Sequence, residues 1–183
     1  MKTKKQTRFI LTSHAYSLLT LDLLAISVGC HTPAVHPDDL KNFKQVNLVA
    51  NKSEYQPVTI DPTLLNGFGI AWSPTGIAWV NSVGGHVSEL YSAEGAIVRA
   101  PVNNTSPTDS SGGLPCGIVF SGGKGFNLPN GPSSFLFTGF DGVLSGWNGA
   151  SGNNAQRLKA SAGNSYTGLA IGVNAGNNFI YGA

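Results

Sequence analysis

Residues that could carry out catalysis are few and scattered in this sequence. It contains no Gly-x-Ser-x-Gly nucleophile elbow, no His-Glu-x-x-His zinc pair and no P-loop. The Gly/Ser stretch at 110–113 lacks the lysine of a phosphate loop and is typical of a linker. His31 and His36 lie in a polar, Pro-bearing stretch without a third ligand in view. The sequence therefore predicts no catalytic residue, no cofactor and no metal site.

The residue with the clearest predicted chemistry is Cys30, at the end of the N-terminal leader. Positive residues lie within 2–8, apolar residues dominate 9–28, and Ser27-Val28-Gly29-Cys30 closes the stretch. This order is typical of an export signal. Small residues before a cysteine resemble a bacterial lipobox, whose cysteine becomes the lipidated first residue after cleavage. We predict a lipoprotein-like signal peptide over 1–30, with Cys30 as the lipid attachment site. An ordinary secretory signal and a retained membrane helix are the alternatives.

The other candidate side chains are predicted to be structural. Cys116 begins an apolar run that ends at Phe120, and no motif places a basic group beside the thiol, so a small buried residue is expected. Tryptophan could stack on a sugar, but Trp72 and Trp79 lie in predicted strand cores, where packing between sheets is expected. His86 lies in a Gly-Gly turn and should be exposed.

The elements that would position these residues are short strands separated by turns. Glycine supplies 24 of 183 residues, charged residues are only 11 %, and no long stretch has the apolar period of a helix. From Cys30 onward seven Lys/Arg face eight Asp/Glu, so no basic surface for nucleic acid is expected. The basic balance of the whole chain belongs to the leader.

A repeated phrase organises the predicted strands. It occurs as Gly-Ile-Ala, Gly-Ile-Val and Gly-Leu-Ala, beginning at Gly69, Gly117 and Gly168, which are 48 and 51 residues apart. A period near 50 in an all-β pattern is typical of propeller blades with four strands each. We predict an all-β fold: a tether over 31–43, then an incomplete β-propeller over 44–183. Its roughly two and a half blades would span about 67–99, 114–160 and 166–183.

Strands are expected at the following positions: 44–50; 69–72, 77–81, 87–91 and 97–99 in the first blade; 117–120, 134–138, 142–147 and 156–159 in the second; and 168–171 and 178–181 in the third. Glu89, Glu94 and Arg99 suggest a solvated outer edge for the first blade. Residues 102–113 are predicted to be a surface loop. The stretch 124–132 is predicted to be an insertion that offers a contact surface.

The order of motifs resembles a known family. Asn66 to Gly76, Asp141 to Asn148 and Tyr166 to Gly172 look like three successive blade signatures of an uncharacterised family of exported bacterial proteins. Some members carry PEP-CTERM tails, and the family resembles NHL-type six-bladed propellers. The resemblance covers about residues 43–182 and implies a propeller fold and export. It implies no catalytic residues, and proteins of that family are longer than this chain.

Two functions of different classes follow from these features. The first is a non-catalytic, lipid-anchored scaffold of the cell envelope that binds a protein or glycan. The alternative is a truncated propeller hydrolase or lyase whose site residues lie in missing blades. The predicted strand starts nearest a channel, such as Asn66, Pro115 and Thr167, offer no carboxylate, which favours the scaffold. An incomplete propeller would also expose apolar sheet faces, so we expect the chain to associate.

Overall fold

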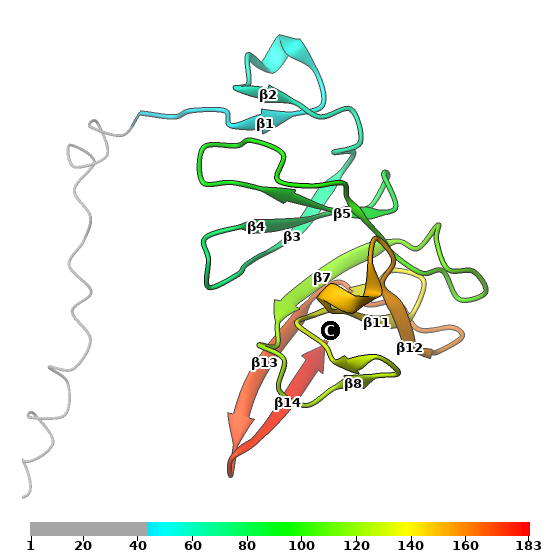
Figure 1. Cartoon of the computed structure of the whole chain (residues 1–183). Coiled ribbons are helices and arrows are strands. Elements are labelled where there is room, and N and C mark those ends of the chain that lie inside the picture. The colour runs from blue at the N-terminus through cyan, green and yellow to red at the C-terminus, as the bar shows by residue number, and fades with distance from the viewer. Residues whose placement is uncertain (1–43) are drawn as a thin grey trace, which may run out of the picture. The chain divides into compact units, whose positions relative to one another are not determined.

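A computed structural model describes residues 44–183, which form an all-β structure of several small sheets (Figure 1). The predicted signal peptide, the tether and Cys30 lie outside the described residues. Within 44–183 the only helical turns are two short 3₁₀ segments, Ser53–Tyr55 and Gly149–Ser151. No helix in this part of the chain is long and apolar enough to cross a membrane.

The first four-stranded sheet, sheet I, is an antiparallel meander in sequence order. Its strands are β3 (Gly67–Trp72), β4 (Ala78–Ser82), β5 (Val87–Tyr91) and β6 (Val102–Asn103). The turn between β3 and β4 forms as its residues predict: Gly76 has φ of 81°, and its N–H donates to the Ser73 carbonyl oxygen at 3.0 Å. The expected strand at 97–99 is wrong, because only Ile97 bridges to Tyr91. The fourth strand lies instead at the start of the expected loop.

The second four-stranded sheet, sheet II, has the order β12-β11-β10-β7. Its strands are β7 (Pro115–Phe120), β10 (Phe135–Gly139), β11 (Val143–Trp147) and β12 (Gln156–Ala160). The predicted insertion at 124–132 does separate the first two strands, and it carries a small ladder of β8 (Asn127–Leu128) and β9 (Gly131–Pro132). All four strands of sheet II were predicted to within three residues.

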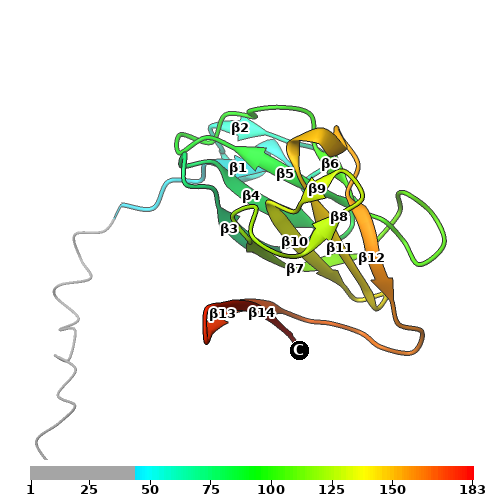
Figure 2. The same ribbon diagram turned by 60° about the horizontal axis from the view of Figure 1, so that its bottom comes forward.

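The third unit is a two-stranded hairpin, here called the third hairpin, which lies beside sheet II (Figure 2). It consists of β13 (Leu169–Asn174) and β14 (Asn177–Gly182). Ala175 and Gly176 form its two-residue turn, with φ of 48° and 78°, as tight hairpins require.

A separate small ladder pairs β1 (Val49–Ala50) with β2 (Thr59–Ile60) in parallel. The expected long strand over 44–50 is therefore only two residues long, and its partner is β2, which follows it closely in the chain.

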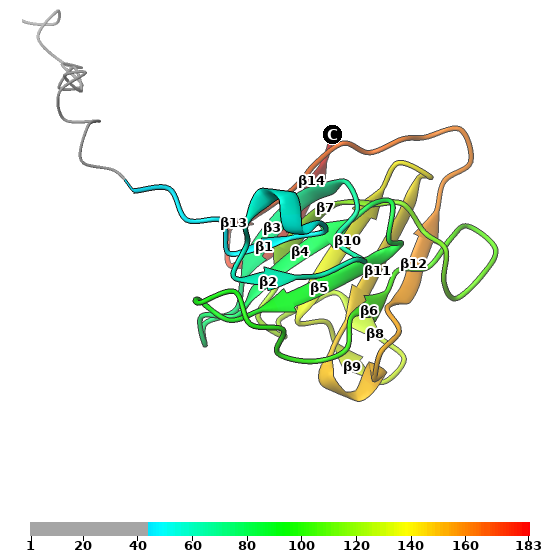
Figure 3. The same ribbon diagram turned by 90° about the horizontal axis from the view of Figure 1, so that it is seen from above.

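Sheets I and II enclose the main core between their facing surfaces (Figure 3). Trp79 stacks on Phe135 with ring centroids 4.1 Å apart, and Trp147 lies 4.8 Å from Trp79. Leu90, Val102 and Phe137 complete the contact, all almost fully buried. We call this surface of sheet I its near face and the opposite surface its far face.

The repeated glycines have a packing reason that the sequence did not reveal. A Cβ on Gly69 would overlap the Cys116 carbonyl oxygen, and one on Gly117 would lie 2.6 Å from the Leu169 backbone nitrogen. Each glycine thus lets the first strand of its unit approach the first strand of the next, β3 to β7 and β7 to β13. At Gly168 an added Cβ would meet nothing within 4 Å.

Candidate functional site

The two cysteine predictions have different outcomes. Cys30 lies outside the described residues, so its lipidation stays a prediction. Cys116 is buried as predicted, and its thiol donates to the Tyr166 carbonyl oxygen at 2.8 Å. Burial raises the pKa of this thiol above its ordinary value, which disfavours the thiolate that a nucleophile needs. No group of three or more His, Cys, Asp or Glu side chains suited to a metal lies within residues 44–183.

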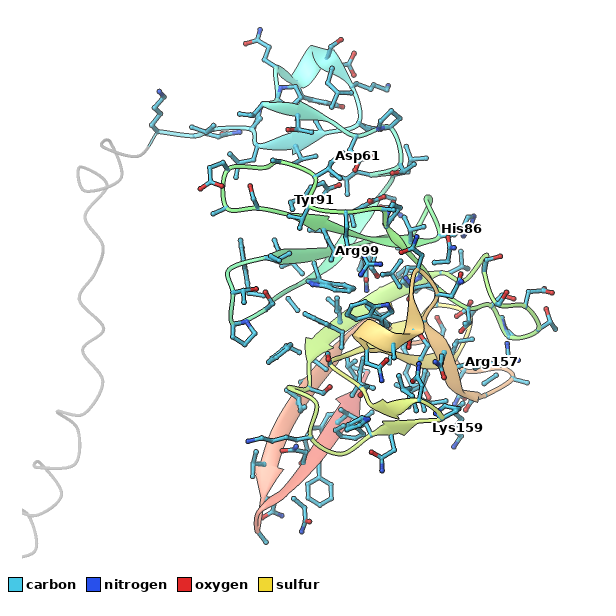
Figure 4. All side chains as sticks on the ribbon, viewed as in Figure 1. Asp61, His86, Tyr91, Arg99, Arg157 and Lys159 are labelled. Carbon is cyan, nitrogen blue, oxygen red and sulfur yellow. The ribbon has the colours of Figure 1, made fainter. Side chains whose placement is uncertain are left out.

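The densest cluster of ionisable groups lies on the far face of sheet I, where the segment after β2 crosses β5. Asp61, Glu89 and Tyr91 are each less than 5 % exposed. The Tyr91 hydroxyl donates to Asp61 Oδ2 at 2.8 Å, and Figure 4 shows these two residues side by side. Thr63 Oγ1 lies 2.6 Å from both Asp61 Oδ1 and Glu89 Oε1. The prediction of a solvated edge at Glu89 is therefore wrong.

The two short contacts at Thr63 require a proton from one of the two carboxyl groups. A hydroxyl has one proton to donate, so it cannot donate to two carboxylates at once. A protonated Glu89 that donates to Thr63 Oγ1, with Thr63 donating to Asp61, satisfies both short contacts. The pKa of Glu89 is raised accordingly, chiefly by burial and further by the charge of Asp61, although the Thr63 hydrogen bond opposes the shift.

This carboxylate cluster holds the chain together and does not form an open site. Thr63 and Leu65 are joined to sheet I a second time by Ser82, whose hydroxyl donates to the Thr63 carbonyl oxygen at 2.6 Å and accepts from the Leu65 N–H at 2.8 Å. The buried carboxylates have no exposed surface on which to bind a substrate. We infer that the cluster holds residues 61–65 against β5 and the end of β4, a region here called the outer half of the far face.

The part of the same face over β3, here called its inner half, is open and apolar. Ile70 and Trp72 on β3 are 56 % and 54 % exposed, and they border a groove of about 400 Å³. The groove is lined mainly by apolar side chains, including Val46, Leu48 and Val80. Expected packing between sheets is thus correct for Trp79 and wrong for Trp72, because alternation along the chain places the two rings on opposite faces.

Sugar recognition has a weaker candidate site on sheet II. A polar depression of about 430 Å³ is lined by residues of 105–110 and 151–157 but by no aromatic side chain. Its guanidinium, that of Arg157, donates to the Ser106 carbonyl oxygen at 2.7 Å and so holds the loop. Trp147, the tryptophan nearest in sequence, is buried in the core. His86 is exposed as predicted, and its Nδ1 is hydrogen-bonded to the Gly113 carbonyl oxygen at 2.8 Å.

Comparison with known proteins gives no assignment: no protein-family model matches the chain, and no curated protein matches it.

Proposed function

We propose that this chain is an exported, lipid-anchored scaffold of the β-propeller type that binds a protein through the far face of sheet I. The observation that carries the proposal is the open apolar groove beside Ile70 and Trp72. Large side chains of this kind, gathered on one face, are characteristic of surfaces that bind other proteins.

The chemistry of the groove favours a protein over a glycan. Ile70 and Val80 border Trp72, so the surface offers aliphatic contact and few polar groups for the hydroxyls of a sugar. The partner we infer presents a neutral, apolar β-surface. Residues 44–183 contain no open cluster of ionisable groups that would support the alternative of a hydrolase or lyase.

The propeller type is supported by the way the units follow one another. Two four-stranded meanders and the third hairpin succeed each other in sequence order, and the first strand of each contacts the first strand of the next. The close approach at Gly69 and Gly117 is the same step made twice. Neighbouring blades of a propeller cover each other's faces in this manner.

Site-specific photocross-linking in cells that export the chain tests the binding surface. A benzoylphenylalanine at position 70 should give discrete protein adducts, and Trp72→Ser should remove them. The adduct identified by mass spectrometry should bind the purified chain, again dependent on Trp72. The same cross-linker at Thr108, on an exposed loop, serves as the control. Glycan adducts, or equal adducts at both positions, would overturn the proposal.

Fatty-acid labelling tests the anchor separately. Wild-type chain should incorporate a labelled fatty acid, and Cys30→Ser should not. Equal labelling of the two would contradict lipidation at Cys30, and failure to export either chain would contradict the leader.

A further inference from the structure

The repeated phrase gives corresponding positions in the three units, and their burial differs. The residue after each repeated glycine is Ile70, Ile118 and Leu169. Ile118 is 6 % exposed because the near face of sheet I covers it, whereas Ile70 is 56 % exposed. Ile70 therefore has the side chain and the orientation of a covered position, and residues 44–183 leave it more than half exposed.

On the third hairpin, the opposite face is the exposed one. Ala71, Val119 and Ala170 follow one residue later and point to the other face. On the third hairpin this face carries Tyr181, which pairs with Ala170 across the ladder, and Phe179. Tyr181 and Phe179 are 60 % and 44 % exposed. Within residues 44–183, two apolar faces are thus largely exposed, one of each kind that meet between sheets I and II.

From these matched faces we infer that the partner is a second copy of this chain, joined head to tail. The third hairpin of one copy covers the far face of sheet I of the next, so that Phe179 and Tyr181 pack on Ile70 and Trp72. This inference rests on the proposed function, since it uses the same surface, and it names the partner.

Glycine supplies an independent argument for the same contact. Gly69 and Gly117 each admit the first strand of the following unit at a distance that a Cβ would forbid, while an added Cβ at Gly168 meets nothing within 4 Å. Repeating the step at Gly168 places the β3 strand of a second copy against β13. Residues 160–183 contain no charged side chain, so no like charge opposes the approach.

The outer half of the far face leaves room for this partner. Residues 61–65 are hydrogen-bonded to Glu89 of β5 through Thr63 and to Ser82 at the end of β4, and Val46 and Leu48 border the groove, but Ile70 and Trp72 of β3 stay more than half exposed. A two-stranded hairpin placed over β3 would therefore lie beside residues 61–65 and beside Val46 and Leu48. Because the two contacting faces differ, the interface is heterologous, and it generates a ring or a chain of copies.

Sedimentation equilibrium of the purified full chain, with Gly168→Val as the critical variant, tests the inference. An added Cβ at Gly168 meets nothing within 4 Å in one copy, so the circular dichroism spectrum and the unfolding midpoint at high dilution should not change. Association should weaken by more than about tenfold, which corresponds to about 1.4 kcal/mol. Val173→Ala, at an exposed site on the other face of the third hairpin, is the matched control and should associate like wild type.

Disulfide trapping identifies the faces, in a Cys30→Ser background. Ile70→Cys and Tyr181→Cys chains with different tags should form a mixed dimer on oxidation, and neither should cross-link efficiently to itself. Dimers linked 70 to 70 or 181 to 181, or a wild-type chain that stays monomeric at high concentration, would overturn the inference. A monomer that still gives a foreign protein adduct at position 70 would leave the proposed function standing. Mixed dimers, together with no adduct to another protein at position 70, would support a second copy of the chain as the only partner.

Discussion

The two faces of sheet I come from the same strands and are stabilised in different ways. The near face is closed by aromatic and aliphatic packing on sheet II, centred on Trp79. The far face is closed over β5 by a hydrogen-bonded cluster of buried carboxylates and hydroxyls, and it is open over β3 at Trp72. Substitutions should therefore reduce the free energy of unfolding most where they remove buried apolar volume, less where they remove a partner from the polar cluster, and least on the open surface.

The largest effect is expected on the near face. Trp79→Ala removes a ring that is 3 % exposed and contacts Phe135, Phe137 and Trp147. It should lower the free energy of unfolding by about 3–5 kcal/mol, because the cavity adds to the lost burial. Chemical denaturation followed by circular dichroism measures this change. A loss below about 1 kcal/mol would mean that the two sheets do not share a core in solution.

A smaller loss is expected when the polar cluster loses its central hydroxyl. Thr63→Val keeps the shape of the side chain but leaves Asp61 and Glu89 without their shared partner. The free energy of unfolding should fall by about 1–3 kcal/mol, as for a buried hydrogen-bonding group left unpaired. Thr75→Val, in the exposed turn between β3 and β4, is the control for the substitution itself. Equal losses in the two variants would contradict the role of Thr63.

The same cluster predicts how stability depends on pH. The folded pKa of Glu89 is raised above its ordinary value of 4.5, so the folded chain holds this proton more tightly than the unfolded chain. The stabilisation is fully present below pH 4.5 and is lost as the pH rises through the higher folded value.

Glu89→Gln should flatten this dependence, because an amide can donate to Thr63 Oγ1 at every pH. Denaturation midpoints of wild type and variant, measured from pH 4 to 9, decide the matter. A variant with the same slope as wild type would contradict a protonated Glu89.

The smallest effect on stability is expected on the open part of the far face. Trp72→Ser removes a ring that is 54 % exposed, so at high dilution unfolding should change by less than about 1 kcal/mol. The association and the adducts described above should be lost all the same. A large loss of stability in the dilute chain would show that the ring is covered within one copy.

Most local elements of this chain follow from the sequence alone. Strand β5 was predicted residue for residue, and the Ser73-Pro74-Thr75-Gly76 turn and the tight turn of the third hairpin follow from residues that favour those backbone angles. The spacing of the repeated phrase located the first strand of each unit. The prediction for Trp72 and Trp79 did not use strand alternation, which depends only on neighbouring residues and places the two rings on opposite faces.

Which face of a sheet is covered, and by which residues, depends on contacts between segments far apart in the chain. Trp72 and Trp79 look alike in sequence, but Trp79 faces sheet II and Trp72 faces the open groove. Glu89 looks like an edge residue, yet it is buried and hydrogen-bonded to Thr63, 26 positions earlier in the chain. The repeated glycines indicated a period in the sequence. The close backbone contact that Gly69 and Gly117 permit is with the next unit, nearly 50 residues further along the chain. Burial and protonation depend on groups brought together by folding, and separation along the chain hides those groups from any local pattern.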